Sequence, residues 1–307
     1  MNIIQNLSQL VGNTPMYEIT AYDLPEDVRL FAKLEFQSIG GSIKDRLGFY
    51  LIQKAIEKGK LQKGDTVIEP TAGNTGIGLA LAAIHYELDA VFVTPEKFSQ
   101  EKQALMRALG AEVINTPTER GMSYAIQKAK QLASESPKAY IPNQFHNEDN
   151  PNTYYDTLGP EIMADLDGKV DVFIAGAGSG GTFTGTARYL KEKNPQVKTI
   201  IAEPQGSILN GGDPGPHKTE GIGMEFLPDF MDQSLFDAIY TITDERAFAR
   251  LAEIAKYEGL LVGSSSGVAL EAALKEAELA EPGTNIVTIF PDSSERYLST
   301  GIYGGAD

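Results

Sequence analysis

Short apolar runs alternate with longer amphipathic stretches along most of the chain. The apolar runs have the length and composition of buried strands, and we expect strands at residues 66–68, 90–93, 112–114, 170–175, 199–202, 238–242 and 285–290. The stretches between them have helical periodicity, and we expect helices at residues 75–86, 100–109, 121–134, 182–193, 244–257 and 268–280. This alternation is typical of βαβ units, so the sequence predicts an α/β fold with parallel sheets covered on both faces.

Two blocks of this pattern are separated by a polar segment. Residues 143–152 (NQFHNEDNPN) contain few aliphatic side chains and include an Asn-Pro pair, which is typical of a connection between domains. We therefore expect one α/β domain over residues 1–150 and a second over residues 151–307. The segment near residues 12–35 is a candidate to pack on the second domain.

The composition excludes several classes of function. The 307 residues include 26 Lys and Arg against 42 Asp and Glu, and the net charge of −16 argues against nucleic acid as a ligand. The sequence has no cysteine and only three scattered histidines, so we expect neither disulfides nor a metal site. No run approaches the roughly 20 apolar residues of a membrane span, and residues 1–10 lack the pattern of a signal peptide. We expect a cytoplasmic protein without a membrane partner.

A glycine-rich turn follows the strand expected at residues 170–175 and opens the next helix. Residues 176–182 (GAGSGGT) allow several backbone N–H groups to point at one anion, and the helix N-terminus adds a partial positive charge. Because Glu203 stands at the end of the following strand, the run also fits the dinucleotide-binding pattern of a nicotinamide enzyme. A tight turn without a ligand is the third interpretation, and the motif alone does not decide among the three.

Three further turns carry candidate chemistry. Residues 71–75 (TAGNT) offer N–H groups and hydroxyls to a carboxylate, although Thr and Asn also cap helices without a ligand. Lys44 stands near a helix start, where the dipole favours the neutral amine that an imine-forming nucleophile requires. Most lysines are nevertheless solvated surface residues. The serines of residues 263–267 (GSSSG) either cap a helix or bind a ring nitrogen.

Taken together and in this order, the four turns resemble those of the pyridoxal-phosphate enzymes of the cysteine synthase and cystathionine β-synthase family. The resemblance extends from residues 10–15 (LVGNTP) to residues 291–297 (PDSSERY) and thus over nearly the whole chain. It implies the tryptophan-synthase-β-like fold (fold type II), with two parallel-sheet α/β domains. It also implies pyridoxal 5′-phosphate as the cofactor and a homodimer.

The resemblance implies a role for residues of each turn. Lys44, in residues 42–46 (SIKDR), matches the lysine that binds the cofactor and acts as general base. Asn74 matches the asparagine at the cofactor's 3′-oxygen, and Ser265 matches the serine that faces its ring nitrogen. The residues that match the phosphate site are Gly178, Ser179, Gly180, Gly181 and Thr182. Those that match the substrate-carboxylate site are Thr71, Ala72, Gly73, Asn74, Thr75 and Gln144.

The implied reaction is a β-replacement on O-acetyl-L-serine or L-serine by a sulfur nucleophile, which gives cystathionine from homocysteine or cysteine from sulfide. Residues 220–223 (EGIG) and 291–293 (PDS) resemble cystathionine β-synthases, whereas residues 295–300 (ERYLST) resemble cysteine synthases. These motifs therefore leave the nucleophile open, and O-phosphoserine also stays open as a donor. Ala72 stands where many relatives have serine, which removes one hydroxyl from the carboxylate loop. The sequence resembles most the small bacterial enzymes that use O-acetylserine.

Three alternative functions fit these residues less well. A dehydratase of the same fold is disfavoured by the SIKDR motif and by Gln144. A nicotinamide oxidoreductase would leave Lys44, Asn74 and Ser265 without a role. A catalytically silent relative that binds a partner protein would have no need of Lys44.

Overall fold

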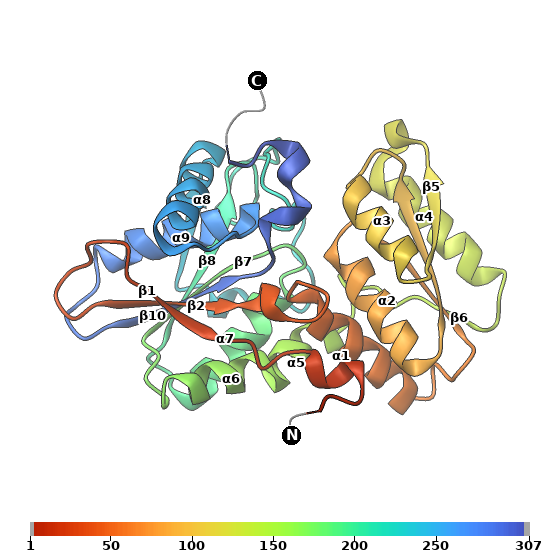
Figure 1. Cartoon of the computed structure of the whole chain (residues 1–307), viewed down its shortest axis with the longest axis horizontal. Helices are drawn as coiled ribbons and strands as arrows, with labels where there is room; N and C mark the ends of the chain where they lie inside the picture. Colours follow the sequence, from red (N-terminus) through yellow and green to blue (C-terminus); the bar gives the residue numbers. More distant parts are fainter. Residues whose placement is uncertain (1–2, 304–307) are drawn as a thin grey trace. The chain divides into compact units, whose positions relative to one another are not determined.

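The computed structural model describes residues 3–303, which divide into two α/β units (Figure 1). The first unit comprises the chain up to Gly12 and Ser38–Asp149, and the second comprises Asn13–Gln37 and the chain from Asn150 onward. The chain thus enters the second unit at Asn13, returns to the first at Ser38, and leaves it again after Asp149. Within residues 3–303, no helix has the length and apolarity needed to span a membrane.

The first unit contains a four-stranded parallel sheet. Its strand order is β5 (Glu112–Thr116), β4 (Asp89–Pro95), β3 (Thr66–Pro70) and β6 (Ala139–Tyr140). The helices are α1 (Lys44–Glu57), α2 (Asn74–Tyr86), α3 (Gln100–Ala108) and α4 (Gly121–Ser134), with short 3-10 helices at Leu7–Leu10 and Thr118–Arg120. Alternate strand residues face opposite ways. Val67 and Phe92 therefore join the core formed with α1, α2 and α3, whereas Ile68 and Val93 pack on α4.

The second unit contains a six-stranded sheet. Its order is β1 (Met16–Ile19), β2 (Arg29–Leu34), β10 (Asn285–Phe290), β7 (Val172–Gly176), β8 (Lys198–Pro204) and β9 (Ala238–Ile242), and every pair is parallel except β1 with β2. Its helices are α5 (Asp149–Asp156), α6 (Leu158–Asp165), α7 (Gly181–Lys193), α8 (Asp244–Glu258) and α9 (Ser264–Ala277). Short 3-10 helices lie at Glu35–Gln37, Gln233–Leu235, Ser294–Arg296 and Leu298–Thr300.

The predicted α/β class with two parallel sheets is confirmed. Each expected strand and helix is present, with ends that coincide with the expected ones or differ from them by at most four residues. The sequence patterns did not predict β1, β2, β6, α5 or α6. Strand β2 was missed because the buried Lys33 interrupts its apolar run, and β6 is only two residues long. Helix α5 was missed because it is polar and contains Pro151, and these features resemble those of a connection.

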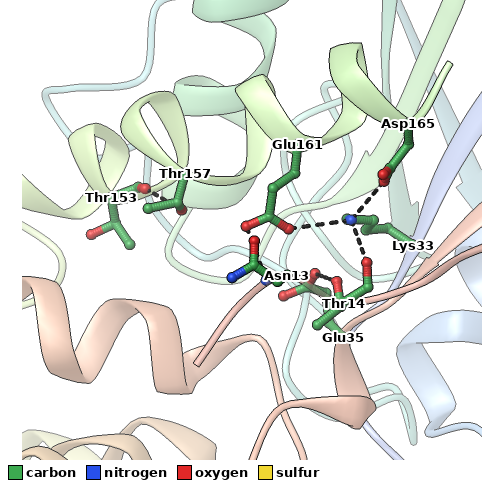
Figure 2. A network of polar contacts seen from close by, with 8 residues as sticks. All are labelled: Asn13, Thr14, Lys33, Glu35, Thr153, Thr157, Glu161 and Asp165. Atoms are coloured by element: carbon green, nitrogen blue, oxygen red, sulfur yellow. Dashed lines mark hydrogen bonds and ion pairs between the residues drawn. The ribbon is translucent and has the colours of Figure 1, made fainter. Parts of the chain in front are cut away.

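The buried Lys33 fixes the segment by which the chain enters the second unit (Figure 2). Its Nζ lies 2.7 Å from Asp165 Oδ2 and 3.2 Å from Glu161 Oε2, and it donates a hydrogen bond to the Thr14 carbonyl oxygen. Glu161 also accepts the Asn13 backbone N–H at 3.1 Å. Because both carboxylates belong to α6, this network ties Asn13 and Thr14 to α6 through a compensated buried charge.

Helices α1 and α2 cross at two glycines, which allows their backbones to touch. A Cβ atom on Gly78 would lie 2.2 Å from the Lys44 carbonyl oxygen, and one on Gly48 would lie 2.2 Å from the Gly78 carbonyl carbon. No side chain larger than hydrogen fits at either position without movement of the backbone. This contact fixes the start of α1, and therefore Lys44, against the second turn of α2.

We expect the Gly78→Ala variant to be destabilised by about 1–3 kcal/mol, because the added methyl group must push α1 away from α2. Urea unfolding followed by circular dichroism measures the loss. The matched control is Gly212→Ala, whose Cβ would meet only the Ser207 carbonyl oxygen at 3.5 Å; we expect its stability to stay within about 0.5 kcal/mol of the wild type. Equal stability of both variants would contradict the close crossing.

Candidate active site

Lys44 is the first residue of α1, and a buried carboxylate shapes the turn that precedes it. Asp45 Oδ2 accepts the Gly40 backbone N–H at 2.6 Å, and Ser42 Oγ accepts the Lys44 N–H at 3.3 Å. Asp45 and Ser42 are fully buried, whereas Lys44 is half-buried. The backbone at Lys44 is therefore held firmly while part of its side chain stays accessible.

The predicted carboxylate loop connects β3 to α2 in the same unit. The N-cap of α2 is Gly73, which has no side chain to satisfy the first N–H groups of the helix. Thr71 Oγ1 accepts the Gly73 N–H at 3.2 Å, and Thr75 Oγ1 donates to Gln144 Oε1 at 3.0 Å. The structure thus brings Gln144, which is distant in sequence, beside the loop to which the resemblance assigns it. An uncapped helix N-terminus with flanking hydroxyl and amide groups suits a carboxylate ligand.

Glu69, at the end of β3, holds the segment that carries Gln144. Its Oε2 accepts the Asn143 backbone N–H at 3.1 Å and its Oε1 accepts the Gln144 backbone N–H at 3.4 Å. Burial raises the pKa of Glu69 to about 7, although the two backbone donors act in the opposite direction. No motif in the sequence indicates a role for Glu69. Its one local signal is a glutamate directly after two apolar residues of a strand, in residues 66–70 (TVIEP).

The predicted phosphate loop lies in the second unit, between β7 and α7. The N-cap of α7 is Gly180, again without a side chain, and Asn150 Nδ2 donates to Ser179 Oγ at 3.0 Å. A Cβ atom on Gly178 would lie 2.1 Å from the Gly221 carbonyl oxygen, and one on Gly181 would lie 1.9 Å from Asn150 Oδ1. The loop therefore has room only for glycine at these positions, and its geometry suits backbone N–H contacts to one phosphate group.

The three serines at the start of α9 lie near the phosphate loop. Helix α9 begins at Ser264, after Gly263 as N-cap, and Ser264 Oγ accepts the Glu220 N–H at 2.9 Å. Gly223 N–H donates to the Ala177 carbonyl oxygen at 3.0 Å. The segment 220–223 therefore contacts both the phosphate loop and the first turn of α9, where Ser265 is buried.

Glu203 does not have the role that a nicotinamide enzyme would give it. Its side chain is 1% exposed, and its carboxylate accepts the backbone N–H groups of Leu209 and Asn210, both at 3.1 Å. These contacts fix the loop after β8 and occupy the oxygens that would bind a ribose. The motif at residues 176–182 therefore fits a single phosphate better than a dinucleotide.

The structure groups the predicted site residues by unit. Those of the first unit are Lys44, Thr71, Ala72, Gly73, Asn74, Thr75 and Gln144, and those of the second are Gly178, Ser179, Gly180, Gly181, Thr182 and Ser265. The chemistry of the donor set fits pyridoxal phosphate: a lysine at a helix start, a glycine cradle for one phosphate and buried hydroxyls for a ring nitrogen. Within residues 3–303, no group of three or more His, Asp and Glu side chains is arranged to hold a metal ion.

We expect Gly178→Ala to weaken binding of pyridoxal phosphate at least about tenfold, which corresponds to about 1.4 kcal/mol. The added methyl group would meet the Gly221 carbonyl oxygen and displace the N–H groups of the loop. Titration of the cofactor-free protein, followed by visible absorbance, gives the dissociation constant. Gly212→Ala serves again as the control, and an unchanged constant for Gly178→Ala would contradict the proposed cradle.

Comparison with known proteins supports the same cofactor and fold. The family described as "Pyridoxal-phosphate dependent enzyme" matches residues 7–292. The O-acetylserine dependent cystathionine beta-synthase of Bacillus subtilis (strain 168) is 60% identical over 305 residues, which cover 99% of this chain and 99% of that protein. A cysteine synthase of Helicobacter pylori (strain ATCC 700392 / 26695) is 55% identical over 305 residues, which cover 99% of this chain and 100% of that protein.

Solved structures of similar proteins have the same fold as this chain. The O-acetylserine dependent cystathionine beta-synthase from Helicobacter pylori has a TM-score of 0.93 at 55% identity and covers 99% of this chain and 100% of its own. A hydrogen sulfide-producing enzyme from Fusobacterium nucleatum has a TM-score of 0.91 at 40% identity, with coverages of 96% and 100%. The fold and cofactor implied by the four turns are thus confirmed. Because the family match spans most of the sequence and the relatives align over nearly their whole lengths, this chain belongs to the pyridoxal-phosphate dependent enzymes.

Proposed function

We propose that this enzyme catalyses β-replacement on O-acetyl-L-serine or L-serine by a sulfur nucleophile, and that it forms cystathionine from homocysteine and cysteine from sulfide. The observation that carries the proposal is the pairing of Lys44 with an amino-acid carboxylate site in one helix pair. The N-terminus of α2, with Thr71, Thr75 and Gln144, offers the carboxylate site, and α2 packs on the backbone of Lys44 through Gly78. Relatives named for both products are 55–60% identical.

The residues of the first unit act on the substrate. Pyridoxal phosphate, when bound, supplies an electron sink for negative charge at the α-carbon. Lys44 Nζ would hold the cofactor and, once displaced by the substrate amine, take the α-proton and later return it. Acetate leaves the β-carbon more readily than hydroxide, which favours O-acetylserine over serine. Asn74 would contact the cofactor's 3′-oxygen.

The remaining residues bind and orient the substrate and the cofactor. Thr71, Thr75 and Gln144 would hold the substrate carboxylate through side chains, whereas Ala72 and Gly73 contribute N–H groups. The N–H groups and hydroxyls of residues 178–182 would hold the cofactor phosphate. The Ser265 hydroxyl would meet the ring nitrogen without a formal charge, which keeps the electron sink weaker than a carboxylate partner would make it.

The proposal includes the setting in which the enzyme works. Its partners are small-molecule amino-acid substrates and a second copy of the chain in a homodimer, and its location is the cytoplasm. The homodimer rests on the resemblance, and the location rests on the composition and the patterns of the sequence. A dehydratase of the same fold and a catalytically silent partner-binding relative are the alternatives.

Product analysis of the purified holoenzyme tests the proposal. With O-acetylserine we expect cystathionine from homocysteine and cysteine from sulfide, with pyruvate as a minor product, because the carboxylate site and Lys44 hold the amino acid until the nucleophile adds. Serine and O-phosphoserine, supplied in parallel, rank the donors, and the two nucleophiles compared at equal concentration rank the products. Pyruvate as the main product would indicate a dehydratase. A holoenzyme inactive with all three donors would indicate the silent relative.

A further inference from the structure

Glu69 is a buried acid for which the mechanism above has no use. It is 2% exposed and belongs to β3, two residues before Thr71. Its two carboxylate oxygens accept two consecutive backbone N–H groups, those of Asn143 and Gln144. Only a side chain with two acceptor oxygens satisfies both donors, since a glutamine would turn its own N–H₂ toward one of them.

The surroundings of Glu69 provide no compensating positive charge. Within the described part of the chain, no Lys, Arg or His forms an ion pair with it, and the residue opposite on β4 is the apolar Phe92. The titratable group that its charge reaches is Tyr140 on β6, whose pKa is raised by burial first and then by the charges of Asp149 and Glu69. A buried carboxylate without a cation destabilises the fold when it is ionised. Its presence here calls for a role other than stability.

The contacts of Glu69 lead directly to the proposed substrate site. Asn143 has a φ angle of 54°, a left-handed conformation that few non-glycine residues adopt, and the Glu69 carboxylate holds the N–H of this residue and of the next. The side chain of that next residue, Gln144, accepts the hydrogen bond from Thr75. The same acid therefore precedes one part of the carboxylate site in sequence and anchors the other part in space.

We propose that Glu69 is a positioning residue for the substrate carboxylate: the ionised side chain fixes the backbone of Asn143 and Gln144, and its protonation releases Gln144 and weakens substrate binding. The inference rests on the proposed function, because it assigns the substrate carboxylate to Gln144 and the start of α2. Glu69 acts through Gln144 and does not itself contact the substrate.

The inference predicts a pH dependence with a definite sign. With a pKa of about 7, Glu69 is mostly ionised at pH 8, and about one tenth remains ionised one unit below the pKa, so the KM for O-acetylserine should rise by up to about tenfold between pH 8 and pH 6. The stability of the fold changes in the opposite direction to substrate affinity. Because the folded-state pKa lies above that of an unfolded glutamate, Glu69 contributes stability at low pH that is lost as the pH rises through about 7.

The test compares wild-type holoenzyme with Glu69→Gln and Glu69→Asp from pH 5.5 to 8.5, at saturating nucleophile. Glu69→Gln should have a high, pH-independent KM in this range, with kcat and the cofactor spectrum little changed. The melting temperature of this variant, relative to that of the wild type, should increase as the pH rises. Glu69→Asp keeps both acceptors and should restore part of the affinity together with its pH dependence.

The matched control is Glu258→Gln. Glu258 also accepts two consecutive backbone N–H groups, those of Thr20 and Ala21 at 2.7 and 2.6 Å, but it lies in the second unit and contacts none of the proposed site residues. This variant should keep the wild-type KM and its pH profile.

Two results would overturn the inference while leaving the proposed function intact: a wild-type KM that stays flat between pH 8 and pH 6, or a Glu69→Gln enzyme with wild-type KM and pH profile. The first needs no variant, so it holds even if Glu69→Gln does not fold. A wild-type holoenzyme that turns over none of the three donors at any pH would overturn the proposed function, and the inference with it.

Discussion

The contact between Gly78 and the Lys44 carbonyl oxygen is the constraint on which the first unit depends. Lys44 begins α1 and Asn74 begins α2, so a backbone contact one turn into α2 sets the distance between the two helix starts. The position of Lys44 relative to the carboxylate loop is therefore determined by main-chain packing, which is stiffer than side-chain contacts. Catalysis that depends on orientation benefits from groups mounted on rigid elements in this way.

The glycines and buried acids around the site have complementary tasks. Helices α2, α7 and α9 all begin after a glycine N-cap, which leaves their first N–H groups for a ligand, whereas α8 is capped by the Thr243 side chain. Buried or partly buried carboxylates, meanwhile, accept the N–H groups of nearby loops: Asp45 at Gly40, Glu69 at residues 143–144, Glu203 at residues 209–210 and Asp244 at residues 218–219. Part of the acidic composition thus serves to hold loops in place.

The sequence predicted the alternating part of the fold well, because buried parallel strands such as β7 and β10 are continuous apolar runs. It did not predict β1 and β2, since the Lys33 ion pairs that make β2 a buried strand involve α6 residues far along the chain. Candidate turns were identified from local motifs, and their roles came from the resemblance. The link from Glu69 to Gln144 was not predictable, because almost every residue has a backbone N–H group and the sequence therefore does not indicate which one Glu69 binds.

Lys44 is proposed to bind the pyridoxal phosphate through which this chain works. Reduction of the holoenzyme with borohydride, followed by peptide mass mapping, identifies the lysine that binds the cofactor, because the reduced linkage survives digestion. We expect the phosphopyridoxyl mass on the peptide that contains Lys44, and its loss from that peptide when O-acetylserine is added before reduction. The mass on another lysine, or on none, would show that Lys44 does not bind the cofactor.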